Sequence, residues 1–229
     1  MQMVDRVPDW MTPVAWVYIG LSLAAAVVVA ADIHLGRRRH ARVATELVWI
    51  TSALYLGPFA VPLYRSRGRA AVGAPEATTT TTTATTTAPA PASSDVVAAG
   101  LPGGGASAVA HLIGVPLVLA SGLTIAGIDL WVMILVIGAL AMLLLFVYER
   151  GTLPLGAAAT AAVVTVLAFD VGMGGWMLLL HVNELMPPAT EGSFWFLMQV
   201  GIILGLATGY PAVRWLRRSR RTAEPVPVP

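Results

Sequence analysis

Long apolar runs separated by short polar segments dominate the pattern of this chain. A helical span of about 20 residues, each rising 1.5 Å, crosses a hydrocarbon core of about 30 Å. Six segments reach or approach that length, without the strict alternation of barrel strands. The sequence therefore predicts an all-α integral membrane bundle of about six transmembrane helices. The segments are Thr12–Ala31, Thr45–Tyr64, two within Ala108–Tyr148, Leu155–Leu180 and Phe194–Leu216.

The stretch Ala108–Tyr148 is about twice the length of one span, so we expect it to fold as a hairpin. Gly127 and Asp129 mark the expected turn. We expect helices throughout, because a backbone polar group in lipid must find its partner within its own segment or in a closed barrel.

A segment of different composition separates the second and third spans. Ala74–Ser94 reads APEATTTTTTATTTAPAPASS, and the glycines of Leu101–Gly105 follow it. Such a sequence has too little apolar bulk to bury a core. We therefore predict a disordered linker, either a low-complexity spacer or, if it faces outward, a glycosylated stalk. The predicted units are a two-helix hairpin (1–64), the linker (65–106), a four-helix region (107–217) and a basic, proline-containing tail (218–229).

Composition supports the same class of protein. Hydrophobic residues make up 57% of the chain and charged residues 11%, whereas soluble domains carry about 25% charged residues. All 14 basic side chains are arginines, and they cluster beside the apolar runs. This placement suits lipid headgroups and argues against nucleic-acid binding, which would need an accompanying pattern of aromatic residues. The absence of cysteine excludes disulfides, thiolate metal sites and cysteine nucleophiles.

Two topologies satisfy the preference of arginine for the cytoplasmic side equally well. The first has six crossings and the N-terminus inside. The second has five crossings, the N-terminus outside and a re-entrant third segment. Each places ten arginines inside and four outside, and each puts the C-terminus in the cytoplasm. We expect six crossings in a bacterial inner (plasma) membrane, because Ala108–Tyr148 is long enough for two of them.

Asp170 lies near the middle of the fifth predicted span, where an ionisable group costs about 2.5–3.5 kcal/mol and often marks a pathway. Helical positions advance by about 100° per residue, so four further side chains share its face. This face could line an ion or proton pathway, or coordinate a soft metal ion such as copper. Alternatively, the methionines fill a packed interface and Asp170 makes a structural hydrogen bond. The other members of the face are Met173, Met177, His181 and Glu184.

Further polar residues could extend this face. Asp32 and His34 end the first span, and six crossings would place them on the outer side with His181 and Glu184. Gln199 lies about one turn into the last span, toward the same side. We therefore expect either a convergent outer site or a set of solvated interfacial side chains.

Three prolines interrupt predicted spans: Pro58 and Pro62 in the second, and Pro116 in the third. Transporters use broken helices to expose backbone groups to substrates, although proline kinks also occur in membrane helices without that use. His111 and Glu46 are expected near opposite interfaces.

Glycines repeat at four-residue spacing along the last span, at Gly201, Gly205 and Gly209. Such a stripe lets another helix approach closely. The partner is either a helix of the same chain, with the glycine-rich fifth span as the candidate, or a second copy in a homo-oligomer.

Three stretches together resemble a bacterial membrane family catalogued as domain of unknown function 4396. They read LYLGPFAVPLY (Leu54–Tyr64), DVGMGGWM (Asp170–Met177) and FWFLMQVGIILGLATGYPAVRWL (Phe194–Leu216). The resemblance implies a multi-pass membrane protein without an assigned activity. Many members carry a His-Cys and then a Gly-Cys pair at the start of the third span. His111 stands at the matching position here, but Leu112 and Pro116 replace the cysteines, so a thiol-based role does not carry over.

Enzyme signatures are absent from the sequence, including metalloprotease, serine-hydrolase, phosphate-loop and dinucleotide-binding motifs. We expect no enzyme activity and no cofactor, apart from a metal ion at the Met/His face. Two hypotheses remain. The protein is either a permease-like handler of an ion or small solute, or a non-catalytic scaffold that uses the glycine stripe.

Overall fold

The computed structural model describes residues 7–70 and 93–222, and these form seven α-helices with two short helical turns. No strand occurs within those two ranges. The order is α1 (Met11–His34), α2 (Val43–Leu56), the 3-10 turn η1 (Gly57–Phe59), α3 (Ala60–Leu63), the π-helical turn η2 (Tyr64–Gly68), α4 (Ser93–Ser121), α5 (Asp129–Arg150), α6 (Leu155–Val182) and α7 (Gly192–Thr222).

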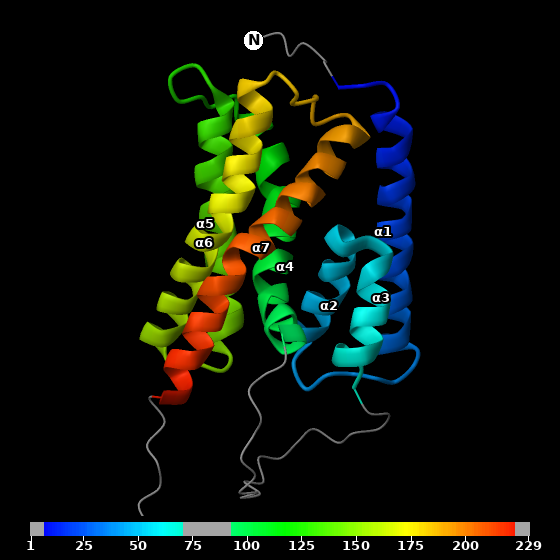
Figure 1. The fold of residues 1–229 in the computed structure, drawn as a ribbon, viewed down its shortest axis with the longest axis vertical. Helices are drawn as coiled ribbons and strands as arrows, with labels where there is room; N and C mark the ends of the chain where they lie inside the picture. The colour runs from blue at the N-terminus through cyan, green and yellow to red at the C-terminus, as the bar shows by residue number, and fades with distance from the viewer. Residues whose placement is uncertain (1–6, 71–92, 223–229) are drawn as a thin grey trace, which may run out of the picture.

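The predicted all-α membrane bundle is confirmed. Six helical segments are long and apolar enough to cross a membrane. Five of them, α1 and α4 to α7, extend along the long axis of the bundle, and α7 crosses it diagonally (Figure 1). The predicted hairpin within Ala108–Tyr148 is present, with its turn between Ser121 and Asp129.

The bundle has an upper and a lower end, named after their positions in Figure 1. The upper end holds the start of α1, the turn between α4 and α5, and the start of α7. Trp16 of α1 lies against Gly192 of α7 there. The lower end holds the loop after α1, the turn between α5 and α6, and the end of α7. Arg42 in that loop donates a hydrogen bond to the Tyr148 carbonyl (2.7 Å).

The sixth apolar segment, Val43–Gly68, does not run straight through the bundle. The rings of Trp49 and Tyr64 pack edge to face at 5.7 Å, and Gly68 lies directly against the Trp49 indole. In a straight helix Trp49 and Gly68 would be roughly 28 Å apart. The chain therefore rises in α2, reverses at η1 and returns in α3 to the lower end (Figure 1). This re-entrant hairpin differs from the expected crossing at Thr45–Tyr64.

Gly57 makes the reversal. Its backbone has φ 57° and ψ −139°, a region that only glycine enters without strain. Pro58 follows, and because proline lacks an N–H it leaves the Leu54 carbonyl without its helical donor. The Gln199 side-chain amide of α7 donates to that carbonyl instead (2.7 Å). The Tyr18 hydroxyl of α1 donates to the neighbouring carbonyl of Tyr55 (2.9 Å).

Ion pairs fasten the base of the hairpin to the end of α1. Asp32 accepts two hydrogen bonds from the Arg69 guanidinium (2.6 and 3.0 Å) and one from the Tyr64 hydroxyl (3.0 Å). The bond to Asp32 raises the pKa of Arg69 above its ordinary value. Glu46, which is 1% exposed, accepts from Arg39 (2.7 Å) and from the backbone N–H of His40 (2.9 Å). The start and the end of the re-entrant hairpin therefore both lie at the lower end.

The predicted linker of residues 65–106 differs from the structure, because part of it belongs to α4. The Thr/Pro tract lies mostly within residues 71–92, outside the described residues, but α4 already begins at Ser93. The glycine run expected to be flexible is helical and buried. A Cβ on Gly104 would lie 2.6 Å from the Tyr55 hydroxyl, and one on Gly105 would lie 2.6 Å from the Thr51 hydroxyl. These glycines let α4 approach α2 closely.

The chain path also changes the topology. The described chain starts at the upper end and finishes at the lower end, as in the five-crossing alternative, but the second segment is re-entrant instead of the third. Every arginine with a described side chain lies at the lower end. These are Arg37, Arg38, Arg39, Arg42, Arg65, Arg67, Arg69, Arg150, Arg214, Arg217, Arg218 and Arg220.

The glycine stripe of α7 lies against α6 of the same chain. A Cβ on Gly205 would lie 2.7 Å from the Phe169 ring, and Gly201 lies against the Met173 sulfur. Gly209 lies beside the Phe169 backbone, where a Cβ would come within 3.8 Å. On the α6 side, Gly172 accommodates the Leu204 carbonyl. The stripe therefore contributes to packing within one chain.

We predict that Gly104→Ala lowers the thermal stability of the detergent-solubilised protein by about 1–3 kcal/mol, because the new methyl group overpacks against Tyr55. Gly20→Ala in α1 is the matched control, since no atom lies within 4 Å of its new Cβ. Thermal unfolding followed by size-exclusion chromatography measures the difference. Equal stability of the two variants would contradict the close approach of α2 and α4.

Candidate functional site

A cavity of about 290 Å³ lies above the tip of the re-entrant hairpin, and we call it the tip cavity. Four elements form its walls: α1, α2, α4 and α7. Its lining includes apolar side chains from all four and three polar residues, Ser22, His111 and Gln199. The cavity exists because the hairpin turns back inside the bundle.

His111 lines this cavity and carries a buried, unpaired hydrogen-bond acceptor. The residue is 3% exposed, and its Nδ1 lies 2.8 Å from the Ser107 carbonyl oxygen. A carbonyl only accepts hydrogen bonds, so Nδ1 must carry the proton of that bond. In the neutral ring, Nε2 is then an acceptor, and no group among the described residues donates to it.

Gln199 presents a second acceptor. Its amide nitrogen donates to the Leu54 carbonyl, which fixes the orientation of the amide and leaves Oε1 as the free atom. Oε1 is buried and has no hydrogen-bond partner among the described residues. Leaving such a group unsatisfied costs about 1–3 kcal/mol. Both unpaired acceptors belong to side chains that line the tip cavity, but the two atoms are themselves buried within the bundle.

Asp170 does not line the tip cavity. Its side chain is partly buried beside α5, where a Cβ on Gly138 would come within 3.3 Å of its Oδ2. No hydrogen bond or ion pair from the described residues reaches its carboxylate. The structural hydrogen bond considered for Asp170 is thus not formed within the described part of the chain.

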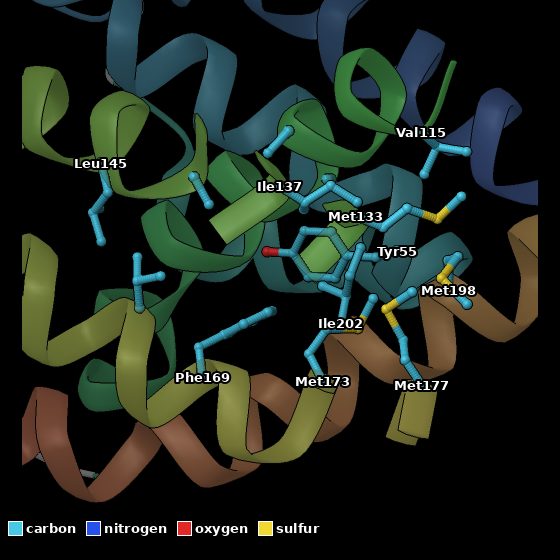
Figure 2. Packing of buried hydrophobic residues seen from close by; sticks show 14 of the residues in the cluster. Tyr55, Val115, Met133, Ile137, Leu145, Phe169, Met173, Met177, Met198 and Ile202 are labelled. Atoms are coloured by element: carbon cyan, nitrogen blue, oxygen red, sulfur yellow. The ribbon is translucent and has the colours of Figure 1, made fainter. Parts of the chain in front are cut away.

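The two methionines of the predicted face belong to the packed core. Met173 and Met177 are each 2% exposed and belong to the same buried cluster as Met133 and Met198. Figure 2 shows these methionines in the buried cluster, supplied by helices α5, α6 and α7. Their placement is that of flexible side chains filling an interface.

His181 and Glu184 line a different cavity, of about 290 Å³, at the upper end. Asp129 and Thr124 also line it. Helix α6 ends at Val182, and Glu184 adopts a left-handed backbone conformation with φ 55°. Glu184 therefore leaves the helical face on which regular spacing placed it, although it remains near His181.

The expected convergence of Asp32 and His34 with His181 and Glu184 does not form. Asp32 and His34 end α1 at the lower end, whereas His181 and Glu184 lie at the upper end. The reason is the re-entrant second segment, which reverses the relation between the end of α1 and all later helices. His111 also differs from expectation, because it lies roughly 15 Å before the upper end of α4 rather than at that end.

The described part of the chain holds no cluster of metal-ligating side chains. Within residues 7–70 and 93–222, no three His, Asp or Glu side chains lie together so that they could hold one ion. The Met/His face is divided between the core and the upper cavity.

Sequence reasoning missed Tyr55, which lines the tip cavity, and Tyr18, whose hydroxyl donates to the Tyr55 carbonyl. The sequence did contain a signal for the break in this helix. Pro58 stands four residues after Leu54, so a helical reading of this segment predicts one unpaired carbonyl at Leu54.

The comparisons with known proteins give one match. The family described as Domain of unknown function (DUF4396) matches residues 94–221, which is more than half of the chain. The matched region contains α4 to α7 and therefore His111 and Gln199, while the re-entrant hairpin lies before it. No curated protein and no solved structure matches the chain.

We predict that Tyr18→Phe destabilises the protein by about 1–2 kcal/mol, because the Tyr55 carbonyl loses its donor inside the bundle. Tyr148→Phe is the control, since the Tyr148 ring contacts Arg42 through its face and a phenyl ring keeps that contact. Thermal unfolding in detergent compares the two. A Tyr18→Phe variant as stable as the control would refute the role of this bond.

Proposed function

The chain belongs to the DUF4396 family, and we propose that it is a permease-like membrane protein that handles a small solute at the tip cavity. The observation that carries this proposal is a helix broken inside the bundle, at Gly57, next to a cavity whose lining includes the polar side chains of Ser22, His111 and Gln199. Half-helices that end within the membrane are the usual means by which transporters build a substrate site.

The chemistry of the tip cavity supports a binding role. Ligand sites are concave and mostly apolar, with a few polar groups that orient the ligand. The tip cavity has that form, because its surface is chiefly apolar and a few polar side chains, among them His111 and Gln199, belong to its lining. This version of the hypothesis moves the site from Asp170 to His111 and Gln199, since Asp170 lies elsewhere.

The position of the arginines supports an orientation. Arginine accumulates in cytoplasmic loops, and the described arginines all lie at the lower end. In our proposal the lower end, with the C-terminus, faces the cytoplasm of a bacterium, and the tip cavity lies in the outer half of its plasma membrane.

The scaffold hypothesis has less support. It relied on the glycine stripe of α7 as a surface for a partner, and α6 of the same chain covers that stripe. A homo-oligomer would therefore need another surface.

The test uses the absence of native cysteine. Ala108→Cys places one thiol in the wall of the tip cavity. In sealed membrane vesicles of each orientation, a charged, membrane-impermeant thiol reagent is applied from one side at a time. A permease opens its site to both sides in turn, so we expect labelling from both, at rates below that of an exposed loop position.

Val166→Cys is the matched control, because Val166 is equally buried in α6 but does not line the tip cavity. We expect it to remain unlabelled. Labelling of Ala108→Cys from neither side would contradict the proposal and favour a scaffold. Labelling from one side only would make the cavity a binding site without a pathway.

A further inference from the structure

A cavity of about 230 Å³ lies at the lower end of the bundle, and we call it the lower cavity. Its lining comes from the loop between α1 and α2, the first turns of α4, the end of α5 with the turn after it, the first half of α6 and the last turns of α7 (Figure 1). We propose that the lower cavity binds a phosphate group, carried either by an anionic lipid headgroup or by a water-soluble phosphate compound. This site is separate from the tip cavity and does not depend on the proposed function.

The lining of the lower cavity is strongly basic. Three arginines, Arg42, Arg217 and Arg220, belong to it, against one acidic residue, Glu149. The accessible surface of the cavity is mainly polar, so a bound group meets polar atoms directly. Guanidinium groups match the oxygens of a phosphate in pairs, and basic pockets between membrane helices are suited to anionic headgroups.

Two of these arginines have N–H groups that the neighbouring protein groups do not use. A guanidinium carries five N–H groups, and Arg42 donates one hydrogen bond, to the Tyr148 carbonyl (2.7 Å). No other acceptor within residues 7–70 and 93–222 bonds to Arg42. Arg220 Nη1 lies 3.8 Å from Glu149 Oε2, which is an ion pair too long for a hydrogen bond. A phosphate in the cavity offers acceptors to both arginines.

The position of Arg42 is set by the end of α5 before any ligand binds. Its guanidinium lies over the Tyr148 ring, 5.2 Å from the ring centroid, and Gly151 lies directly against it. A Cβ at position 151 would overlap the guanidinium, so the glycine is what admits Arg42 here. A side chain that is already ordered loses less entropy when it binds a ligand.

The lower cavity is open at the lower end and closed inside the bundle. Thr152, Arg217 and Arg220 are exposed, whereas Gly103 and Ala161 of its lining are buried. A lipid headgroup and a dissolved phosphate can therefore both enter. The volume of about 230 Å³ is roughly eight times the share of one water molecule in the liquid. This is enough for a phosphate group and part of the molecule that carries it.

The test measures binding to the purified full-length protein in a non-ionic detergent, as the rise in unfolding temperature with probe concentration. The two probes are short-chain phosphatidylglycerol and inorganic phosphate. Short-chain phosphatidylcholine and sodium chloride of matched ionic strength are their respective controls. We expect one or both probes to stabilise the protein at concentrations at least about fivefold below those of the controls, because charge-assisted hydrogen bonds hold the phosphate.

A pair of double variants locates the bound probe. Arg217→Gln combined with Arg220→Gln removes two arginines from the lower cavity. Arg214→Gln combined with Arg218→Gln removes the same charge from the same helix, at residues that do not line the cavity. We expect the first double variant to weaken binding at least about fivefold more than the second.

A pair of glycine variants tests the position of Arg42 without removing a charge. The methyl group of Gly151→Ala displaces the guanidinium, so we expect binding to weaken about two- to fivefold. Gly156→Ala is the control, since no atom lies within 4 Å of its new Cβ. The overlap at position 151 involves only the far end of a flexible side chain, so this variant is expected to fold. It decides the question if the double arginine variant does not fold.

Stabilisation by phosphatidylglycerol alone, with this dependence on the variants, assigns the site to a lipid headgroup. Stabilisation by inorganic phosphate with the same dependence assigns it to a water-soluble compound. Failure of both probes to exceed their controls would overturn the inference. Equal weakening by the two double variants would also overturn it, because the arginines would then act only as diffuse surface charge.

Discussion

The need to satisfy backbone carbonyls away from water governs this structure. A chain that reverses inside a bundle breaks its own helix and frees carbonyls that lipid cannot solvate. Here Pro58 frees the Leu54 carbonyl, and the Gln199 side chain of α7 donates to it. Tyr18 of α1 donates to the neighbouring carbonyl of Tyr55. These two donors connect the tip of the hairpin to α7 and α1.

The reversal of the hairpin inside the bundle also creates the tip cavity. Because the hairpin stops partway, the space above its tip remains a cavity between α1, α4 and α7. Gln199 lines that cavity and also donates its amide to the hairpin. His111 of α4 lines it as well and donates to the Ser107 carbonyl. The side chains that stabilise the interior of the bundle are therefore also the polar members of the cavity lining.

The sequence predicted the fold class because length and hydropathy are sufficient to identify apolar helices. It did not predict the direction of the second segment, since Val43–Gly68 is long and apolar whether it crosses or turns back. Gly57 and Pro58 carried the relevant signal, but proline in a membrane helix has several readings. The glycines before Ala106 predict a flexible linker by composition, whereas in the structure they leave room for the Tyr55 and Thr51 side chains of α2. The site predicted at Asp170 required one continuous helical face. In the structure Met173 and Met177 lie in the core, whereas His181 and Glu184 line the upper cavity.

The most direct test of this account is the sidedness of single cysteines flanking the hairpin in a chain without native cysteine. Leu35→Cys lies before the hairpin, Ser66→Cys lies at its return, and Leu123→Cys marks the upper end. In sealed vesicles, a membrane-impermeant thiol reagent should label Leu35→Cys and Ser66→Cys from the same side and Leu123→Cys from the other. Labelling of Leu35→Cys and Ser66→Cys from opposite sides would mean that the second segment crosses the membrane, and the re-entrant hairpin with its cavity would be wrong.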